Sequence, residues 1–147
     1  MDAFSLLKED HKRVKAKLVE LEATTERAIE TRTQGLEELT QMLVVHEAVE
    51  EEVFYPALKK HAETKAIVLE GYEEHDVVDM ILREVQETPV DSELWAAKFK
   101  VMKENLEHHI EEEEGEMFKD AAEVLDEEAL EDLGRRMEER KGEFQAA

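Results

Sequence analysis

The 147-residue chain contains no cysteine, only two prolines and five glycines, and few aromatic residues (5 %). Without cysteine, a disulfide, an iron–sulfur cluster, a zinc-thiolate site and a thiol nucleophile are all excluded. The scarcity of proline and glycine, with 40 % charged and 41 % hydrophobic residues, favours helix over sheet and argues against a disordered chain. No apolar run approaches the roughly 20 residues of a membrane span. The N-terminal segment also lacks the apolar region of a signal peptide, so we expect a cytoplasmic protein.

Basic residues are also few. The chain has 19 lysines and arginines against 40 aspartates and glutamates, and its formal net charge is −21. Binding to nucleic acid requires a basic surface that displaces counterions, and an anionic membrane attracts basic segments in the same way. We therefore expect neither nucleic acid nor membrane as a partner. Most of the carboxylates are expected to form a solvated surface.

Apolar residues recur at helical spacing along almost the whole chain. Stripes run from Phe4 to Ala28, from Leu36 to Ala57, from Val68 to Val85 and from Trp95 to Met117, and the predicted breaks are 31–35, about 61–64 and 88–92. Short links between long helices predict an all-α, antiparallel, up-down-up-down four-helix bundle. A short additional C-terminal helix is expected at about 126–144, with Asp126 as its N-cap. We expect one domain over residues 1–147, with the bundle at about 2–120.

The sequence also repeats itself. LKEDHKRV around His11 resembles GYEEHDVV around His75, 64 residues later, and HEAVEEEVFYP from His46 resembles HIEEEEGEMFK from His109, 63 residues later. These near-equal offsets indicate a duplicated helical hairpin.

Polar residues occupy several positions where the apolar stripes call for leucine or valine. A single His-x-x-x-Glu pattern is weak, because acids make up 40 of the 147 residues. Its position is more informative, since residues i and i+4 share one helix face. Folding at the predicted breaks brings six stripe residues to one height in the bundle, and these are the candidate metal ligands: His11, His46, Glu50, His75, His109 and Glu113.

Two ionised glutamates in such a core need a compensating charge, and the stripes hold no lysine or arginine. A metal ion would supply that charge. Imidazole and carboxylate ligands without thiolate suit iron or manganese, with zinc possible. Six protein ligands are too many for one tetrahedral zinc and reasonable for two ions of higher coordination number, linked by the glutamates.

These motifs resemble the hemerythrin-like family, also called the HHE cation-binding domain. The resemblance covers roughly residues 2–119 and rests on EDHKRV, HEAVEEEVFYP, EEHDVV and HHIEEEEGEMF. It implies a four-helix bundle with two non-haem iron ions joined by an oxo or hydroxo bridge. The family's ligands then map to His11 of the first helix, His46 and Glu50 of the second, His75 of the third, and His109 and Glu113 of the fourth.

The chain departs from the family pattern in two ways. Hemerythrins proper carry a second histidine on the third helix four residues from the first, where this chain has Gly71 and Asp79. They also place the carboxylate of the fourth helix five residues after its histidine. A fifth ligand is therefore open, and the candidates are His108, Glu47, Tyr55, Tyr72 or water. His108 is favoured because it adjoins the stripe, whereas the tyrosines are expected to pack with their hydroxyls at the rim.

Three functions fit these observations. A di-iron protein can bind dioxygen, nitric oxide or peroxide, or handle iron. An enzyme can use the same metals for peroxide disproportionation, nitric oxide chemistry or oxygen-dependent oxidation. A metal-free bundle can hold the histidines and glutamates in a buried hydrogen-bond network. The sequence names no catalytic residue, organic cofactor, reductant or oligomeric state.

Overall fold

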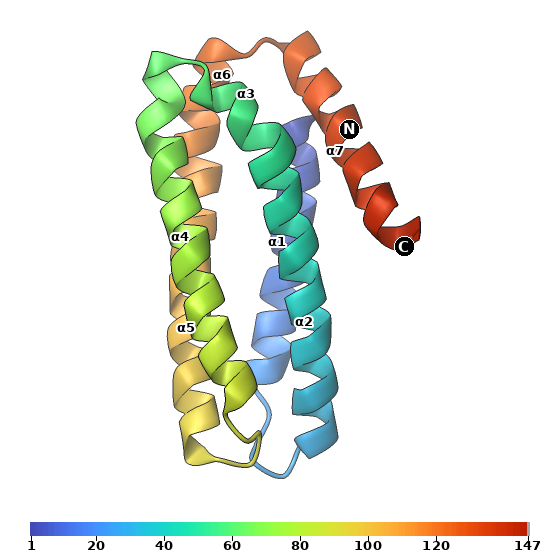
Figure 1. Ribbon diagram of the computed structural model, residues 1–147, viewed down its shortest axis with the longest axis vertical. Coiled ribbons are helices and arrows are strands. Elements are labelled where there is room, and N and C mark those ends of the chain that lie inside the picture. The colour runs from blue at the N-terminus through green and yellow to red at the C-terminus, as the bar shows by residue number, and fades with distance from the viewer. Residues whose placement is uncertain (147) are drawn as a thin grey trace.

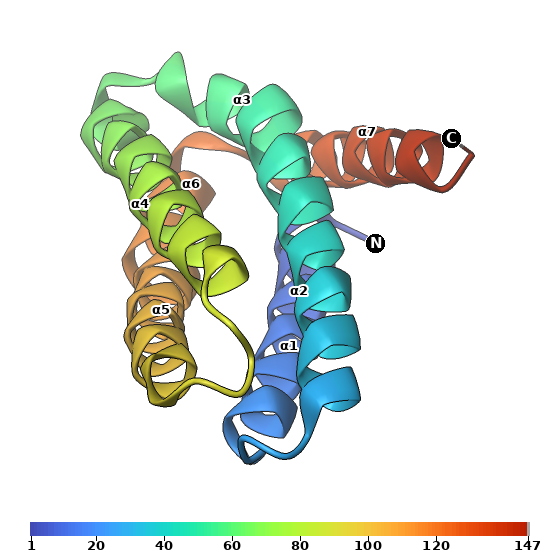
Figure 2. The ribbon, with the colours of Figure 1, turned by 60° about the horizontal axis from the view of Figure 1, so that its bottom comes forward.

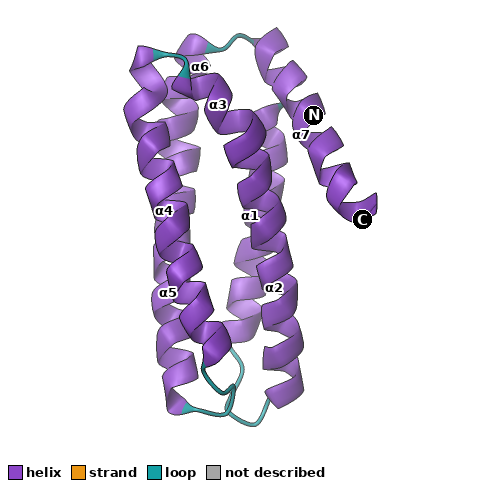
Figure 3. Ribbon diagram, in the orientation of Figure 1, coloured by secondary structure: helices purple, strands orange, loops and turns teal. Residues whose placement is uncertain are grey.

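The computed structural model describes residues 1–146, and every regular element in that range is a helix (Figure 3). The elements, in chain order, are α1 (Ala3–Glu22), α2 (Ile29–Val49), the π-helical turn η1 (Glu50–Phe54), α3 (Tyr55–Lys59), α4 (Ala62–Glu87), α5 (Glu93–Glu112), a second π-helical turn η2 (Glu113–Met117), α6 (Phe118–Val124) and α7 (Glu127–Ala146). No described helix is both long enough and apolar enough to cross a membrane.

Four long helical rods form the bundle: α1, α2 continued through η1 and α3, α4, and α5 continued through η2 and α6 (Figure 1). They alternate in direction, so the predicted up-down-up-down topology is confirmed. The additional C-terminal helix is also present, because α7 leaves the bundle end and crosses the outside of α1 and α2 (Figure 2). Asp2 caps α1 by accepting a hydrogen bond from the Ser5 amide (2.8 Å), and Ser92 caps α5 through the Leu94 amide (3.1 Å).

One of the three predicted breaks is wrong. The first connection is at residues 23–28, and positions 31–35 lie inside α2. Gly35 marks a close helix contact rather than a helix end, because a Cβ there would collide with the Leu21 side chain. The second connection lies at Lys60 and His61, and the third lies at 88–92 as predicted.

Both π-helical turns begin at one of the candidate glutamates, Glu50 and Glu113. A π-turn inserts one extra residue into a helix and so shifts which side chains face inward beyond it. The predicted inward residue Ala57 is accordingly only half-buried, whereas Leu58 is fully buried. The fourth rod shifts in the same way, since both Met117 and Phe118 are buried.

The buried apolar residues form two clusters with the polar residues between them. One cluster, at the end where α3, α6 and α7 meet, includes Leu7, Phe54, Val68, Phe118 and Met137. The other, toward the 23–28 and 88–92 connections, includes Leu18, Leu39, Leu82, Trp95 and Phe99. Burying these side chains stabilises the bundle by about 25 cal/mol per Å² of apolar surface removed from water.

The loop end is closed by Arg32, which is 2 % exposed. Its guanidinium donates to the Thr24 side chain (2.9 Å), the Thr24 carbonyl (3.0 Å) and the Val90 carbonyl (2.6 Å). It also lies 4.3 Å from the centre of the Trp95 ring. These contacts tie the 23–28 and 88–92 connections together.

Candidate metal centre

The six side chains nominated from the sequence lie in one buried layer between the two apolar clusters. None is more than 6 % exposed, and Glu50 and Glu113 are fully buried. The histidines come from α1, α2, α4 and α5, and the two glutamates begin η1 and η2. The predicted common height of these residues is therefore what the structure shows.

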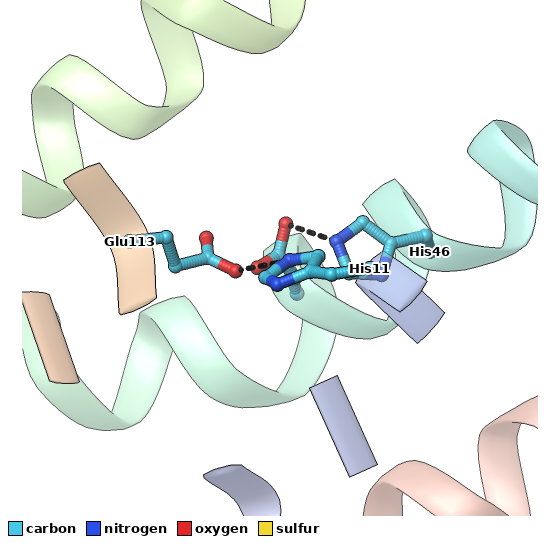
Figure 4. A group of neighbouring side chains, drawn as sticks. His11, His46 and Glu113 are labelled. Atoms are coloured by element: carbon cyan, nitrogen blue, oxygen red, sulfur yellow. Dashed lines mark ion pairs between the residues drawn. The ribbon is translucent and has the colours of Figure 1, made fainter. Parts of the chain in front are cut away.

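One group in this layer consists of His11, His46, Glu50 and Glu113, whose potential ligand atoms all lie within 4.8 Å of one another. His11 Nε2 is 3.0 Å from Glu113 Oε1, and His46 Nε2 is 3.1 Å from Glu50 Oε1. Figure 4 shows His11, His46 and Glu113 converging from different helices. Two imidazoles and two carboxylate oxygens form a donor set for one cation.

A second group consists of Glu50, His75 and His109, again with ligand atoms within 4.8 Å. His75 Nε2 is 3.0 Å from Glu50 Oε1, and His109 Nε2 is 3.5 Å from Glu113 Oε2. Glu50 and Glu113 therefore each lie between histidines of both groups. A carboxylate in that place can bridge two cations.

Each of the four histidines meets a second carboxylate through its other ring nitrogen. His11 Nδ1 is 2.6 Å from Glu114, His46 Nδ1 is 3.3 Å from Asp10, His75 Nδ1 is 2.7 Å from Glu51, and His109 Nδ1 is 2.8 Å from Glu74. Because an ionised carboxylate can only accept, the Nδ1–H group of each ring is the donor. That tautomer directs the Nε2 lone pair into the centre, as in carboxylate–histidine–metal arrangements.

Several polar atoms in the layer are buried without a hydrogen-bond partner. They are His11 Nε2, His46 Nε2, His109 Nε2, Glu50 Oε2 and Glu113 Oε1. Some of these atoms lie close to an opposing glutamate oxygen, but they are not aligned for a hydrogen bond. Buried polar atoms are almost always satisfied in proteins, because leaving one unpaired costs free energy. Lone pairs that converge without donors fit a cation.

The electrostatics of the glutamate pair lead to the same conclusion. Burial disfavours the charge on Glu50, but the positive charge of His46 and the contact with His75 Nε2 (3.0 Å) outweigh it and hold the pKa of Glu50 well below its usual range. Burial and the Glu50 charge instead raise the pKa of Glu113. Burial by itself would lower the pKa of His75. The neighbouring carboxylates outweigh burial and raise the pKa of His75 to about 10. Without a cation, the two glutamates ionise unequally, and protonated imidazoles compensate the charge of Glu50.

Tyr55 lies inside the layer, so the expectation that its hydroxyl stays at the rim is wrong. The hydroxyl donates to Glu113 Oε2 at 2.9 Å and lies 3.4 Å from His75 Nε2. Gly71 makes room for it, because a Cβ there would lie 2.9 Å from the hydroxyl oxygen. Burial and the charges of Glu50 and Glu113 raise the pKa of Tyr55, so the phenol stays neutral and acts as a donor.

The other candidates for a fifth ligand lie outside the layer. The expectation for His108 is wrong, because its side chain is 69 % exposed and meets Glu112 at 3.2 Å. Tyr72 is half-buried and its hydroxyl donates to the Glu51 carbonyl (3.4 Å). Glu47 Oε1 lies 4.0 Å from His75 Nδ1, on the side away from the centre.

A small enclosed cavity of about 10 Å³ lies against the four histidines on the side of the 23–28 connection. Its walls are His11, Val14, Leu43, His46, Glu47, His75, Val78, Leu106, His109 and Ile110. This volume is about that of one water-sized probe. The walls are apolar apart from the histidines and Glu47, so the cavity suits a very small uncharged molecule.

Sequence reasoning missed the four outer carboxylates, Asp10, Glu51, Glu74 and Glu114, since most carboxylates are expected on a solvated surface. Each of them adjoins a candidate ligand in the sequence: Asp10 and Glu74 precede a histidine, and Glu51 and Glu114 follow a glutamate. This adjacency occurs in both repeats of the sequence and could have identified the four outer carboxylates.

The comparisons with known proteins agree with this geometry. The model of the hemerythrin HHE cation binding domain family matches residues 2–121. The fold resembles the crystal structure of a hemerythrin HHE cation binding domain-containing protein from Mycobacterium kansasii, with a TM-score of 0.86, 27 % sequence identity, and coverage of 99 % of this chain and 88 % of that one. No curated protein sequence matches the chain. The resemblance stated from the motifs is confirmed, and the chain belongs to the hemerythrin HHE cation-binding domain family.

Proposed function

We propose that the protein binds two non-haem iron ions in the buried layer. The observation that carries the proposal is the set of five buried nitrogen and oxygen atoms, from His11, His46, His109, Glu50 and Glu113, that converge without hydrogen-bond partners. Imidazole and carboxylate without thiolate suit iron, with manganese or zinc as alternatives. A metal-free bundle would leave these atoms unpaired at a cost in free energy of unfolding.

In this proposal His11, His46, Glu50 and Glu113 would hold one ion, and His75, His109 and the same two glutamates would hold the other. The outer carboxylates fix the tautomer and ring orientation of the histidines. Tyr55 donates to Glu113 and so orients one of the shared carboxylates.

A ferrous pair in such a layer supplies reversible binding of a diatomic molecule or peroxide and the electrons to reduce it. The chain's own residues set what reaches the centre. The cavity beside the histidines admits only a very small molecule, and Val14, Leu43, Val78 and Leu106 keep its walls apolar. We therefore propose binding of dioxygen, nitric oxide or peroxide, or the handling of iron, as the function.

A second candidate is an enzyme at the same site, and Tyr55 is the observation that favours it. Its hydroxyl is held neutral inside the layer, 2.9 Å from Glu113. A neutral phenol beside the centre would donate a hydrogen bond to a small molecule held there. Such a donor would assist peroxide disproportionation, nitric oxide chemistry or oxygen-dependent oxidation.

The decisive experiment is a metal analysis of protein loaded with ferrous iron without oxygen, combined with an absorption spectrum after oxidation. We expect two irons per chain and a near-ultraviolet charge-transfer band. One tightly bound metal or fewer would contradict the proposal. Peroxide added to the loaded protein then tests for peroxide disproportionation, because a disproportionating enzyme evolves oxygen catalytically and a binding protein bleaches.

A further inference from the structure

Asp10 is the point at which α7 reaches the metal centre. Its carboxylate is 6 % exposed, and Oδ2 accepts from His46 Nδ1 at 3.3 Å. Oδ1 accepts from Lys141 of α7 at 2.5 Å and also from Arg13. The same carboxylate therefore joins a candidate ligand to a cation carried by another helix.

The position of α7 is fixed by its own packing. Leu130, Leu133 and Met137 are buried in the apolar cluster that contains Leu6 and Val53. Gly134 lies against the start of α1, where a Cβ would collide with the backbone of residues 1–3. Because the family model matches only residues 2–121, the helix that delivers Lys141 lies outside the matched region.

The other three outer carboxylates have no such partner. Among the described residues, Glu51, Glu74 and Glu114 have no lysine or arginine nitrogen within 4.0 Å. They accept from their histidines at 2.7, 2.8 and 2.6 Å, whereas the Asp10 contact is 3.3 Å. The carboxylate that is shared with cations thus makes the longest contact to its histidine.

From these contacts we infer that Lys141 is a positioning residue for the metal centre and acts through Asp10 on His46. It draws Asp10 away from His46 and cancels part of the negative charge behind that imidazole. A histidine backed by a weaker acceptor is a weaker metal ligand, and a nearby positive charge disfavours a cation. Lys141 therefore weakens the cation position of His11 and His46.

This inference rests on the proposed binding of two metal ions, and a Co²⁺ titration tests it. Anaerobic protein is titrated in competition with a chelator, and the visible absorption of Co²⁺ resolves the two binding steps. In Lys141→Met, Asp10 keeps Arg13 and moves toward His46. We expect the Kd of one Co²⁺ binding step to fall on the order of three- to tenfold and the Kd of the other step to stay unchanged.

Four further variants isolate the route of the effect. Arg140→Met is the matched control, because Arg140 lies next to Lys141 on α7 but pairs with Glu52 (3.2 Å); it should bind Co²⁺ like the wild type. Lys141→Arg keeps the charge and should restore wild-type binding. Asp10→Asn should weaken one step by about 10–100-fold, as expected for an outer carboxylate. Adding Lys141→Met to Asp10→Asn should then change nothing more.

The outcomes distinguish a failure of this inference from a failure of the proposed binding of two metal ions. Wild-type protein that binds no second Co²⁺ would overturn both. Two bound ions with Lys141→Met indistinguishable from Arg140→Met, or with weakened binding, would overturn the role of Lys141 alone. An effect of Lys141→Met that persists in the Asp10→Asn background would also overturn it, because the charge would then act without Asp10.

Discussion

The two helical hairpins of the bundle, residues 3–59 and 62–124, contribute equivalent parts to the metal centre. The first hairpin supplies Asp10, His11, His46, Glu50 and Glu51. The second supplies their counterparts, each 63 or 64 positions later: Glu74, His75, His109, Glu113 and Glu114. Yet His11 pairs with Glu114 and His75 pairs with Glu51, across the hairpins. Neither hairpin alone completes the hydrogen bonds of its histidines, so the centre forms only when the two assemble.

The hairpins differ in what closes the centre on each side. Tyr55 of the first hairpin has Phe118 as its counterpart in the second, and Glu47 has Ile110. The first hairpin thus places a hydroxyl on one side of the layer and a carboxyl on the other, whereas the second has only apolar side chains there. The residues that the two hairpins share suit the proposed binding of two ions. The residues that differ between the hairpins make the two proposed ion positions chemically unequal.

The largest expected effect comes from removing a shared glutamate. Glu50→Ala should lose most of the bound metal, by more than the about 10–100-fold typical of an outer partner, because Glu50 lies between both groups of histidines. Glu113→Ala should match it if the hairpins are equivalent. Metal analysis after desalting provides the measurement.

Glu116→Ala is the control, because Glu116 lies in the same π-helical turn as Glu113 but is exposed. It should retain its metal. Equal losses in Glu50→Ala and Glu116→Ala would show that the buried layer is not the binding site.

Removal of the metal should leave the protein helical but less stable. Free metal at about 1,000 times its Kd stabilises by about 4 kcal/mol, which should raise the Tm by roughly 8–16 °C for a chain of this size. Melts followed by circular dichroism at 222 nm, with and without iron, measure the difference. Identical Tm values for the two verified samples would favour the metal-free bundle.

That difference in Tm should widen as pH rises from about 6 to about 8. In the iron-free protein, neighbouring carboxylates overcome the effect of burial, raising the pKa of His46 well above its usual value and that of His75 to about 10. These groups stabilise the iron-free fold below the unfolded pKa, and their contribution is lost as pH rises through the folded value. Metal instead requires deprotonated imidazole. A difference that narrows with rising pH would contradict this balance.

A smaller effect should follow from filling the space beside Gly71 of the second hairpin, which the Tyr55 hydroxyl of the first hairpin occupies. Alanine in place of a helical glycine normally stabilises by about 1 kcal/mol. Gly71→Ala should instead destabilise by about 1 kcal/mol, because its Cβ would lie 2.9 Å from the Tyr55 hydroxyl and displace it from Glu113. Tyr55→Phe should cost a similar amount. Denaturant unfolding measures both variants.

The matched control for Gly71 is Gly142→Ala in α7, where an added Cβ meets nothing within 4 Å. It should be neutral or stabilising. If Gly71→Ala proved as stable as Gly142→Ala, the hydroxyl of Tyr55 would not depend on the space beside Gly71.

An effect that emerges only at high pH concerns Glu47, where burial and the adjacent Asp79 raise the pKa of the carboxyl to about 8. A raised carboxyl pKa means that the protonated form is favoured in the folded state, so stability is lost as pH rises from about 4.5 through about 8. Glu47→Gln cannot ionise and can still donate to Asp79. The free energy of unfolding of this variant should match that of the wild type near pH 4.5. Above pH 8 it should exceed the wild-type value by on the order of 1–2 kcal/mol after screening. Equal stability across that range would contradict the shift.

Local patterns in the sequence were sufficient for some of these features and not for others. Thr88-Pro89 and Ser92 mark a true connection, because proline and capping residues act through the backbone next to them. The sequence predicts a break that ends at Gly35 because glycine also ends helices, and only the position of Leu21 reveals Gly35 as a packing contact. His108 and His109 are neighbours of the same type, and one extra residue of rotation decides which is buried.

The sequence alone determined that the chain is helical and that four histidines and two glutamates face its core. That information is local, because a helix repeats every 3.6 residues whatever it packs against. Only the tertiary structure decided which carboxylate backs which histidine, where the Tyr55 hydroxyl points and that Lys141 meets Asp10. Those pairs are separated by up to 131 positions. They depend on the register between helices, which the periodicity of a single helix does not encode, and on two π-helical turns that shift the inward face by one residue.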